Sequence, residues 1–424
     1  MDAYSNLLKS KTTQALFVFL AAALSPHTAA ANCMDSPLEC KGITAEAVYT
    51  GEIWGNVDGG IDTGYDYIDN LDLTLEFDAE EALGWQGATF FAYAIANSKA
   101  ILSDKRVGDS QGISNIAAPD ELKIYELWYE QSLWDDFLNV KLGKYDLNSE
   151  FDVIETAGLF INGSHGIGAD FSQAGRNGPS IFPSTALGAR GRLAFTDTIS
   201  LQSTVFNGVP DDPSRPSETK FGLDGPGILS ATELDYEDEN GTKIGIGYWI
   251  FTGGFDDVFE ADGGGPIRHN TNDGFYVLGE FWPYREAGDR DQGLAAFARF
   301  GFADEDVNQF SNYVGGGLVY TGLFPGRDED QLGLAVATAI NGDPYKDSLR
   351  AAGGVVPDEE INIELSYRFG VMPWLTLQPD MQYVINPGAG ANGDLDDALV
   401  VGMRFEILAF GGSPSGPPGR LDQE

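Results

Sequence analysis

Apolar and polar residues alternate in about sixteen short segments of this chain, which is the pattern of β-strands whose two faces meet different solvents. From Asp69 to Asp78 the odd positions are mainly Leu and Phe, whereas the even positions are Asn, Asp, Thr and Glu. Short segments between the predicted strands, such as 131–137 and 196–198, alternate with long ones. Bacterial membrane barrels alternate short periplasmic turns with longer outer loops, so the pattern predicts an all-β, antiparallel transmembrane barrel of about 16 strands.

The same alternation locates the individual strands. They are expected at 44–57, 68–78, 89–97, 122–131, 137–145, 188–195, 199–207, 229–236, 242–251, 275–282, 294–302, 313–321, 331–339, 361–369, 375–385 and 399–407. The long connections are then 98–121, 147–187, 208–228, 252–274, 340–360 and 386–398. On the early strands, the side chains expected to face lipid are Ala45, Ala47, Tyr49, Ile53, Phe91, Tyr93, Ile95, Tyr125, Leu127, Tyr129, Leu138, Val140 and Leu142.

The composition fits strands in a membrane better than helices. Past Leu24 there is no apolar run near the ~20 residues that a spanning helix needs. The chain has 65 acidic against 25 basic residues, a net charge of −40. This balance argues against nucleic acid, whose binders are basic. Acidic loops at an outer surface would instead lie near lipopolysaccharide and divalent cations, and they make cation preference a competing property of any pore.

The N-terminal region has the layout of a secretory signal peptide. Lys9 and Lys11 precede an apolar stretch at 15–24, Pro26 interrupts it, and small residues follow. We therefore expect a signal peptide at 1–31, a short periplasmic segment at 32–43, the barrel at 44–410, and a Pro/Gly-rich tail at 411–424.

Two cysteines, Cys33 and Cys40, follow the expected cleavage site. In an oxidising periplasm this pair is expected to form a disulfide. A metal site there is disfavoured, because structural zinc needs four ligands.

The longest predicted connection, 147–187, is the best candidate to narrow the pore. A loop of about forty residues is unusual unless it is functional, and a barrel of this size otherwise encloses an open aqueous channel. Its charged residues, expected at the constriction, are Glu150, Asp152, Asp170 and Arg176. The alternative is a surface loop outside the lumen.

The polar positions of the alternating strands are the candidates for the pore lining. The residues expected to line the lumen or contact solute are Arg190, Arg192, Lys141, Glu126, Glu130, Trp128, Trp54, Asp72, Glu76, Arg299, Glu364 and Arg368. Arg190 and Arg192 lie two apart, so both point the same way in a strand. Mixed charges with aromatic faces suit a neutral polyhydroxy solute. Alternatively, the charges form a solvated, mutually paired wall, and Trp54, Trp128 and Trp249 belong to interfacial girdles.

A barrel-borne hydrolase is the remaining alternative. Ser164 is adjacent to His165, and Glu126 and Glu130 could mimic a glycosidase pair, but no complete set of catalytic partners is specified. The segment 58–66 resembles a calcium loop but lacks the distal glutamate. We expect no catalysis, cofactor or metal.

Several segments together resemble the carbohydrate-selective porin (OprB) family. They are YIDNLDLTLEFDAEEALG at 67–84, YELWYEQ at 125–131, GKYDLNSEFD at 143–152, GPSIFP at 178–183 and TALG at 185–188. The resemblance runs from about Tyr49 to Phe405 and implies passive diffusion of sugars across the bacterial outer membrane. A non-specific or cation-preferring porin is the alternative, and the pattern leaves open whether the barrels are monomers or homotrimers.

Overall fold

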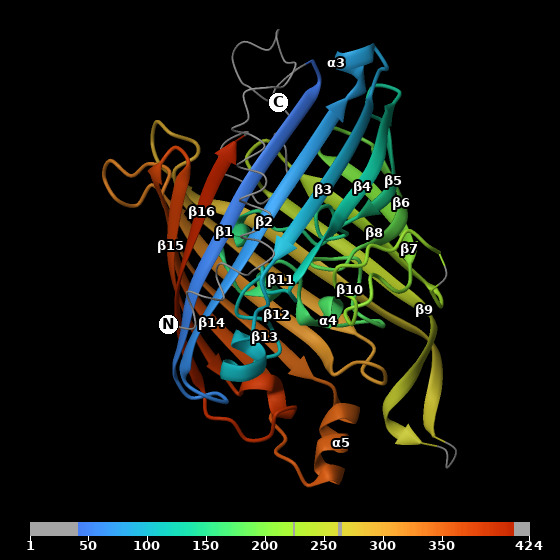
Figure 1. Ribbon diagram of the computed structural model, residues 1–424, viewed down its shortest axis with the longest axis vertical. Coiled ribbons are helices and arrows are strands. Elements are labelled where there is room, and N and C mark those ends of the chain that lie inside the picture. Colours follow the sequence, from blue (N-terminus) through green and yellow to red (C-terminus); the bar gives the residue numbers. More distant parts are fainter. Residues whose placement is uncertain (1–40, 224, 262–264, 411–424) are drawn as a thin grey trace.

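Sixteen antiparallel strands form one closed barrel in the computed structural model, which describes residues 41–223, 225–261 and 265–410 (Figure 1). Each strand pairs with its neighbours in the sequence, and β1 closes the barrel against β16. The predicted fold class is therefore confirmed. The predicted signal peptide, Cys33, Cys40 and the tail lie outside the described residues.

The strands have the following bounds. They are β1 Ile43–Asp58, β2 Gly64–Asp78, β3 Ala88–Asn97, β4 Glu121–Leu133, β5 Leu138–Tyr145, β6 Ala186–Ala194, β7 Ile199–Asn207, β8 Ile228–Glu237, β9 Lys243–Ala261, β10 Pro266–Arg285, β11 Gly293–Ala303, β12 Phe310–Thr321, β13 Gln331–Asn341, β14 Glu359–Met372, β15 Leu375–Ile385 and β16 Ala398–Phe410. Helical segments in the connections are α3 Ala79–Leu83, η1 Ser103–Val107, η2 Thr156–Leu159, η3 Gly163–His165, α4 Ala169–Ser172, α5 Asp343–Ala352 and η4 Pro387–Gly390. No helix in these described ranges is long and apolar enough to span a membrane.

The two ends of the barrel differ in the length of their connections. One end carries tight turns such as the one between Met372 and Leu375, together with α3, the start of β1 and the end of β16 (Figure 1). The other end carries the connections 98–120, 146–185 and 208–227, and also α5. By the general rule for bacterial barrels, the short-turn end faces the periplasm and the long-loop end faces outward.

The expectation of a long connection at 252–274 is wrong. β9 and β10 continue through this region as a paired two-stranded ribbon that projects beyond the barrel (Figure 1). The ribbon extends past the closed barrel, and most of its side chains are exposed or partly exposed, although Phe255 and the Asp257 side chain are buried. Its sequence therefore lacks the apolar alternation by which the other strands were located.

The predicted facing of two early strands also needs correction. Phe91, Tyr93 and Ile95 are buried on the lumen side, where the Tyr93 hydroxyl donates to Asp72 (2.6 Å). The other face of β3 carries Phe90 and small alanines, so both faces are apolar and alternation alone could not distinguish them.

In β4 a register shift opposite Tyr93 and Ala94 changes the facing of the strand. A bulge of this kind places one extra residue in the strand and reverses the side-chain phase beyond it. Tyr125 consequently turns inward and donates to Asp146, whereas Leu127 stays exposed on the outside.

The outer surface of the barrel is an apolar band. Its exposed side chains include Leu75, Phe90, Leu127, Leu142, Val205, Leu234, Ile246, Val277, Phe300, Val314, Leu334, Leu365, Met381 and Val401. The exposed tryptophans Trp85, Trp134 and Trp374 lie by the short turns, where an interfacial girdle is expected. Trp54 and Trp249 are fully buried instead, so a girdle position for these two is wrong.

Candidate pore constriction

The connection 146–185, here called the constriction loop, packs inside the barrel. Its Phe171 stacks on Trp249 of β9, with ring centroids 4.8 Å apart and planes 3° from parallel. Phe160 packs against Phe297 of β11 at 5.8 Å. These contacts belong to a cluster of buried residues that joins the loop to the inner face of the wall, so part of the lumen is filled by protein.

Glutamates of the wall hold this loop by its peptide groups. The Glu280 carboxylate accepts the backbone N–H groups of Glu155 (3.1 Å) and Thr156 (2.7 Å). Glu364 accepts those of Ile161 (2.5 Å) and Asn162 (3.0 Å) in the same way.

The second inward loop, 98–120, is held similarly. Glu360 on β14 accepts the backbone N–H groups of Ser110 (2.8 Å) and Gln111 (3.0 Å). Gln382 on β15 donates to the carbonyl oxygen of Ile113 (2.8 Å). A carboxyl group that accepts hydrogen bonds from two N–H groups holds the backbone firmly where water is excluded.

Arg299 on β11 makes the central ionic contact between wall and constriction loop. Its guanidinium donates to the carboxylates of Asp152 (2.7 Å) and Asp170 (2.7 Å). All three side chains are almost completely buried. Arg299, Asp152 and Asp170 were predicted to be solute contacts or constriction charges, but their geometry is that of an internal anchor.

We call β8–β15 the loop-bound wall. Its anchoring side chains are Glu233, Lys243, Trp249, Glu280, Arg299, Tyr313, Glu360, Glu364, Gln378 and Gln382. Sequence reasoning missed Glu233, Glu280 and Glu360. The alternation of each strand indicates that these side chains face the lumen, but it does not reveal which loop they contact there.

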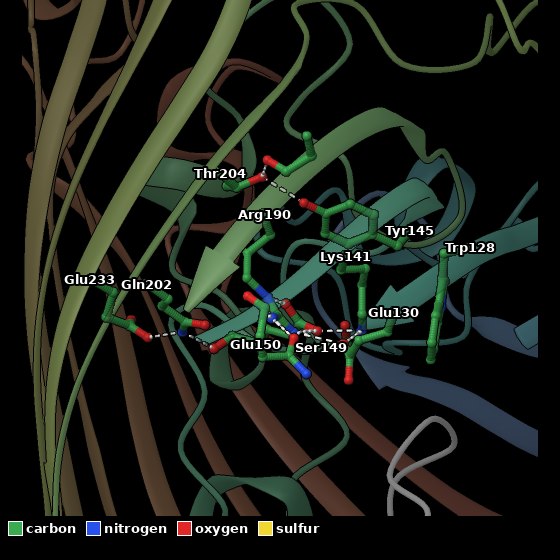
Figure 2. Close-up of polar contacts among 12 residues, drawn as sticks. Trp128, Glu130, Lys141, Tyr145, Ser149, Glu150, Arg190, Gln202, Thr204 and Glu233 are labelled. Atoms are coloured by element: carbon green, nitrogen blue, oxygen red, sulfur yellow. Dashed lines mark hydrogen bonds and ion pairs between the residues drawn. The ribbon is translucent and has the colours of Figure 1, made fainter. Parts of the chain in front are cut away.

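A different arrangement joins β4–β6 to the constriction loop, where Glu130, Lys141 and Arg190 of the strands and Glu150 of the loop alternate in sign (Figure 2). Arg190 donates to Glu150 (2.8 Å) and Glu130 (2.9 Å). Lys141 pairs with Glu150 and lies 3.4 Å from Glu130. Burial alone would raise the pKa of the Glu150 carboxyl, but Lys141 and Arg190 lower it to about 2. The group is therefore an anion at any physiological pH.

Trp128 borders this charged network. Its ring stacks on Phe91 with centroids 4.9 Å apart, and the Lys141 ammonium lies 3.9 Å from the ring centroid. Its Nε1–H donates to Glu126 (2.8 Å), which keeps the indole in one orientation. Trp128 remains partly exposed, in contrast to the buried Trp54 and Trp249.

The network leaves polar groups open to the lumen. Glu130 and Glu150 keep 19% and 14% of their side-chain surface exposed. Arg192 is exposed, and within the described ranges its guanidinium has no hydrogen-bond or ion-pair partner. Glu76 on β2 is also partly exposed. We call Glu76, Trp128, Glu130, Lys141, Arg190 and Arg192 the open wall.

The remaining predicted site residues lie in other surroundings. Asp72 and Glu126 are buried beside the open wall. Arg368 pairs with Glu406 (2.8 Å) near the short turns, and both side chains are partly exposed. Trp54 packs under the loop 98–120 with Leu102 and Ile113, so solute contact by Trp54 is wrong.

The last constriction residue, Arg176, does not point into the charged network. Its side chain is exposed and donates to the carbonyl oxygens of Gly253 (3.0 Å) and Gly254 (2.8 Å) on β9. The arginine fastens the loop to the rim of the barrel.

The Ser164 and His165 pair lacks the geometry of a nucleophile and its base. In the described part of the chain no hydrogen bond joins the two side chains, and neither imidazole nitrogen has a hydrogen-bond partner. Burial lowers the pKa of His165 to about 3, which keeps the ring neutral. His165 packs between Phe160 and Phe297 as a core residue.

Comparison with known proteins gives a consistent result. The model of the family described as "Carbohydrate-selective porin, OprB family" matches residues 62–408. Porin B of Pseudomonas aeruginosa is 28% identical over 409 residues, which covers 87% of this chain and 88% of that protein. The putative porin QuiX of Acinetobacter baylyi is 23% identical over 413 residues, covering 87% of this chain and 90% of the relative. The high-pH structure of Pseudomonas putida OprB has the same fold, with a TM-score of 0.78, 24% identity, and coverage of 87% of this chain and 94% of that one.

Proposed function

The chain belongs to the carbohydrate-selective porin, OprB family, and from this premise we propose that the open wall, together with Glu150 of the constriction loop, is the place where a passing sugar is bound. The protein is an outer-membrane channel through which sugars diffuse passively into the periplasm. What we propose beyond this is the set of residues that makes the passage selective.

The observation that carries the proposal is the alternation of charge at one partly exposed place. Arg190 and Lys141 donate hydrogen bonds, whereas Glu130 and Glu150 accept them. A sugar hydroxyl is both a donor and an acceptor, so it can exchange its water partners for these groups in turn. The exposed guanidinium of Arg192 adds donors that no protein group occupies in the described part of the chain.

Trp128 supports the same assignment. Phe91 and the Lys141 ammonium cover the two faces of the Trp128 ring, so a sugar would pack its C–H groups against the partly exposed edge of the indole, which Phe91 and Glu126 hold in one orientation. A rigid surface loses little entropy when a solute binds. Weak binding of this kind favours entry while still permitting release, as conduction requires.

The anchoring contacts argue against a pore dominated by negative charge. Glu280, Glu360 and Glu364 are acids of the lumen, but their carboxylates are bonded to backbone N–H groups. These carboxyl groups are buried under the inward loops, so a passing solute does not contact them. This supports sugar preference over the cation-preferring alternative.

The test is single-channel recording in a planar bilayer with glucose, a disaccharide and succinate. Arg190→Ala and Arg192→Ala should each weaken block by glucose, whereas Arg350→Ala on the outer helix α5 serves as the matched control. Folding is verified by the heat-dependent shift in electrophoretic mobility that intact barrels show. Unchanged glucose block in both variants, with folded protein, would remove these arginines from the binding site.

Two finer points belong to the same proposal. We propose that passage involves no catalytic step, so incubation of the purified protein with a disaccharide should release no monosaccharide. We also propose that the outer apolar band contacts lipid and that the acidic outer loops contact lipopolysaccharide through divalent cations. Native mass spectrometry distinguishes a monomer from a homotrimer.

A further inference from the structure

The ribbon formed by β9 and β10 beyond the barrel carries a group of side chains unrelated to the pore. Asp257 lies on β9, His269 on β10, and Asp306 in the connection between β11 and β12. Three separate segments of the chain thus bring one imidazole and two carboxylates together. Their potential ligand atoms all lie within 4.8 Å of one another.

The geometry within this group is ordered. His269 Nε2 lies 2.9 Å from Asp257 Oδ2. The other oxygen of Asp257 accepts the backbone N–H groups of Phe259 (2.9 Å) and Glu260 (2.6 Å), so the carboxylate is held with Oδ2 toward the histidine. Only 5% of the Asp257 side chain is exposed, against 26% for His269.

Asp306 is also brought to the group by the backbone. The Val258 N–H donates to the Asp306 carbonyl oxygen (2.9 Å), which joins the β11–β12 connection to the ribbon. Asp306 itself is exposed. The third carboxylate can therefore move the short distance needed to complete a coordination shell while its backbone stays in place.

We propose that Asp257, His269 and Asp306 bind one divalent transition-metal ion, for which Zn²⁺ is the natural probe. Zinc bonds to nitrogen and carboxylate oxygen are about 2.0–2.2 Å long, so two ligands of one ion lie roughly 3 Å apart, as Nε2 and Oδ2 do here. The imidazole nitrogen favours zinc, nickel or copper over calcium, which takes oxygen ligands. The backbone N–H groups that hold the Asp257 carboxylate in place are the kind of outer-shell support that metal ligands usually have.

Bound metal would tie the ribbon to the β11–β12 connection at the long-loop end. The site lies outside the lumen, so sugar passage is expected to stay the same with and without metal. Three protein ligands leave at least one coordination position for water. The competing interpretation is a plain ion pair of His269 with Asp257 that binds no metal.

Isothermal titration of the full mature protein in detergent, stripped with EDTA and then exchanged into buffer without chelator, tests the proposal with ZnCl₂ as the ligand. The expected result is one saturable zinc site. His269→Gln and Asp306→Asn each remove a proposed ligand, so each should weaken binding by at least the about 10- to 100-fold that loss of an outer-shell partner costs. Asp256→Asn is the matched control, because Asp256 is a neighbouring acid that pairs with Arg268 (3.2 Å); it should bind zinc as the unmodified chain does.

Two results would overturn the proposal. One is zinc binding that H269Q and D256N weaken equally, since this describes general attraction to surface acids. The other is the absence of a saturable site in folded protein, with the barrel verified by its electrophoretic mobility. X-ray absorption of the zinc-loaded protein gives an independent reading, because a first shell without imidazole scattering would also contradict the assignment.

Discussion

The loop-bound wall and the open wall carry the same kinds of side chain and use them differently. On β8–β15, Glu280 and Glu364 are buried and bonded to peptide groups of the constriction loop. On β4–β6, Glu130 keeps part of its surface exposed and shares two cations with Glu150. The difference teaches that the charge of a lumen residue says little about selectivity until its partners are known. One wall fixes the shape of the pore, and the other is available to solute.

Removing Arg299 should have the largest effect, because it breaks the buried ion pairs with Asp152 and Asp170 that join the constriction loop to the loop-bound wall. Arg299→Gln leaves Asp152 and Asp170 as buried charges without their partner, which typically costs about 3–5 kcal/mol. We expect a lower unfolding temperature and a larger, noisier single-channel conductance as the loop detaches. Arg368→Gln, in a partly exposed pair, is the control. An R299Q channel with unchanged conductance and stability would contradict the division into two walls.

Glu280 tests the anchoring of peptide groups. Glu280→Ala removes the acceptor of the Glu155 and Thr156 N–H groups, and because both hydrogen bonds are only partly buried the cost should lie at the low end of the about 1–3 kcal/mol for a lost partner. We expect increased current fluctuation and reduced thermal stability. Glu280→Gln retains one acceptor oxygen and should fall between E280A and the unmodified protein. Equal behaviour of E280A and E280Q would argue that the hydrogen bonds contribute little.

A fall in pH is expected to affect the two walls differently. The His165 pKa is lowered from 6.5 to about 3, so its contribution to stability is complete above pH 6.5 and is lost as pH falls toward 3. Between pH 6.5 and pH 5 this amounts to about 2 kcal/mol. Glu364 lies 3.8 Å from His165 Nε2, with Asp380 beyond it, but the Glu364 oxygens are already bonded to Ile161 and Asn162. Because the folded protein keeps the ring neutral down to about pH 3, the loop should stay in place between pH 7 and pH 5 while the free energy of unfolding falls.

The open wall should not respond over the same range of pH. With a folded-state pKa of about 2, Glu150 contributes its stabilisation fully above its ordinary pKa, and this is lost only as pH falls through about 2. Glucose block should consequently remain constant between pH 7 and pH 5, while thermal stability falls. His165→Gln should flatten the stability profile. A stability profile that is the same in H165Q would assign the acid response to other groups.

The smallest stability effect is expected at Glu130. Glu130→Gln removes one charge from a partly exposed network in which Glu150 still pairs with both cations, so the stability cost should be under about 1 kcal/mol. Glucose block should nevertheless change, because the carboxylate is accessible. Calorimetry and bilayer recording on E130Q and E280Q, compared side by side, show whether stability and selectivity reside on different walls.

The sequence predicted the architecture better than it predicted the site. Strand number, antiparallel pairing and loop alternation follow from period-two patterning, which is local and repeated many times. The facing of Phe91, Tyr93 and Ile95 was mistaken because both faces of β3 are apolar. Tyr125 was mistaken because a bulge reverses the phase within β4, and a bulge leaves little trace in a single sequence.

The roles of the charged residues depended on contacts between distant segments. In the sequence, Arg299 is simply another basic residue at a position predicted to face the lumen. Its partners Asp152 and Asp170 come from a loop more than a hundred residues earlier, and no pattern along the chain specifies that meeting. Lys141, Arg190 and Glu130 were each predicted to line the pore, and the structure brings them together because neighbouring strands of a barrel pair in order, so their proximity follows from the register.

The way the wall holds the constriction loop also bears on how such a channel can diversify. Glu280, Glu360 and Glu364 grip peptide N–H groups, which every amino acid except proline possesses. Substitutions in these loop segments can change the side chains that a solute meets while leaving the attachment intact. New solute preferences can therefore arise through single substitutions in the loop, while the strands of the barrel stay the same.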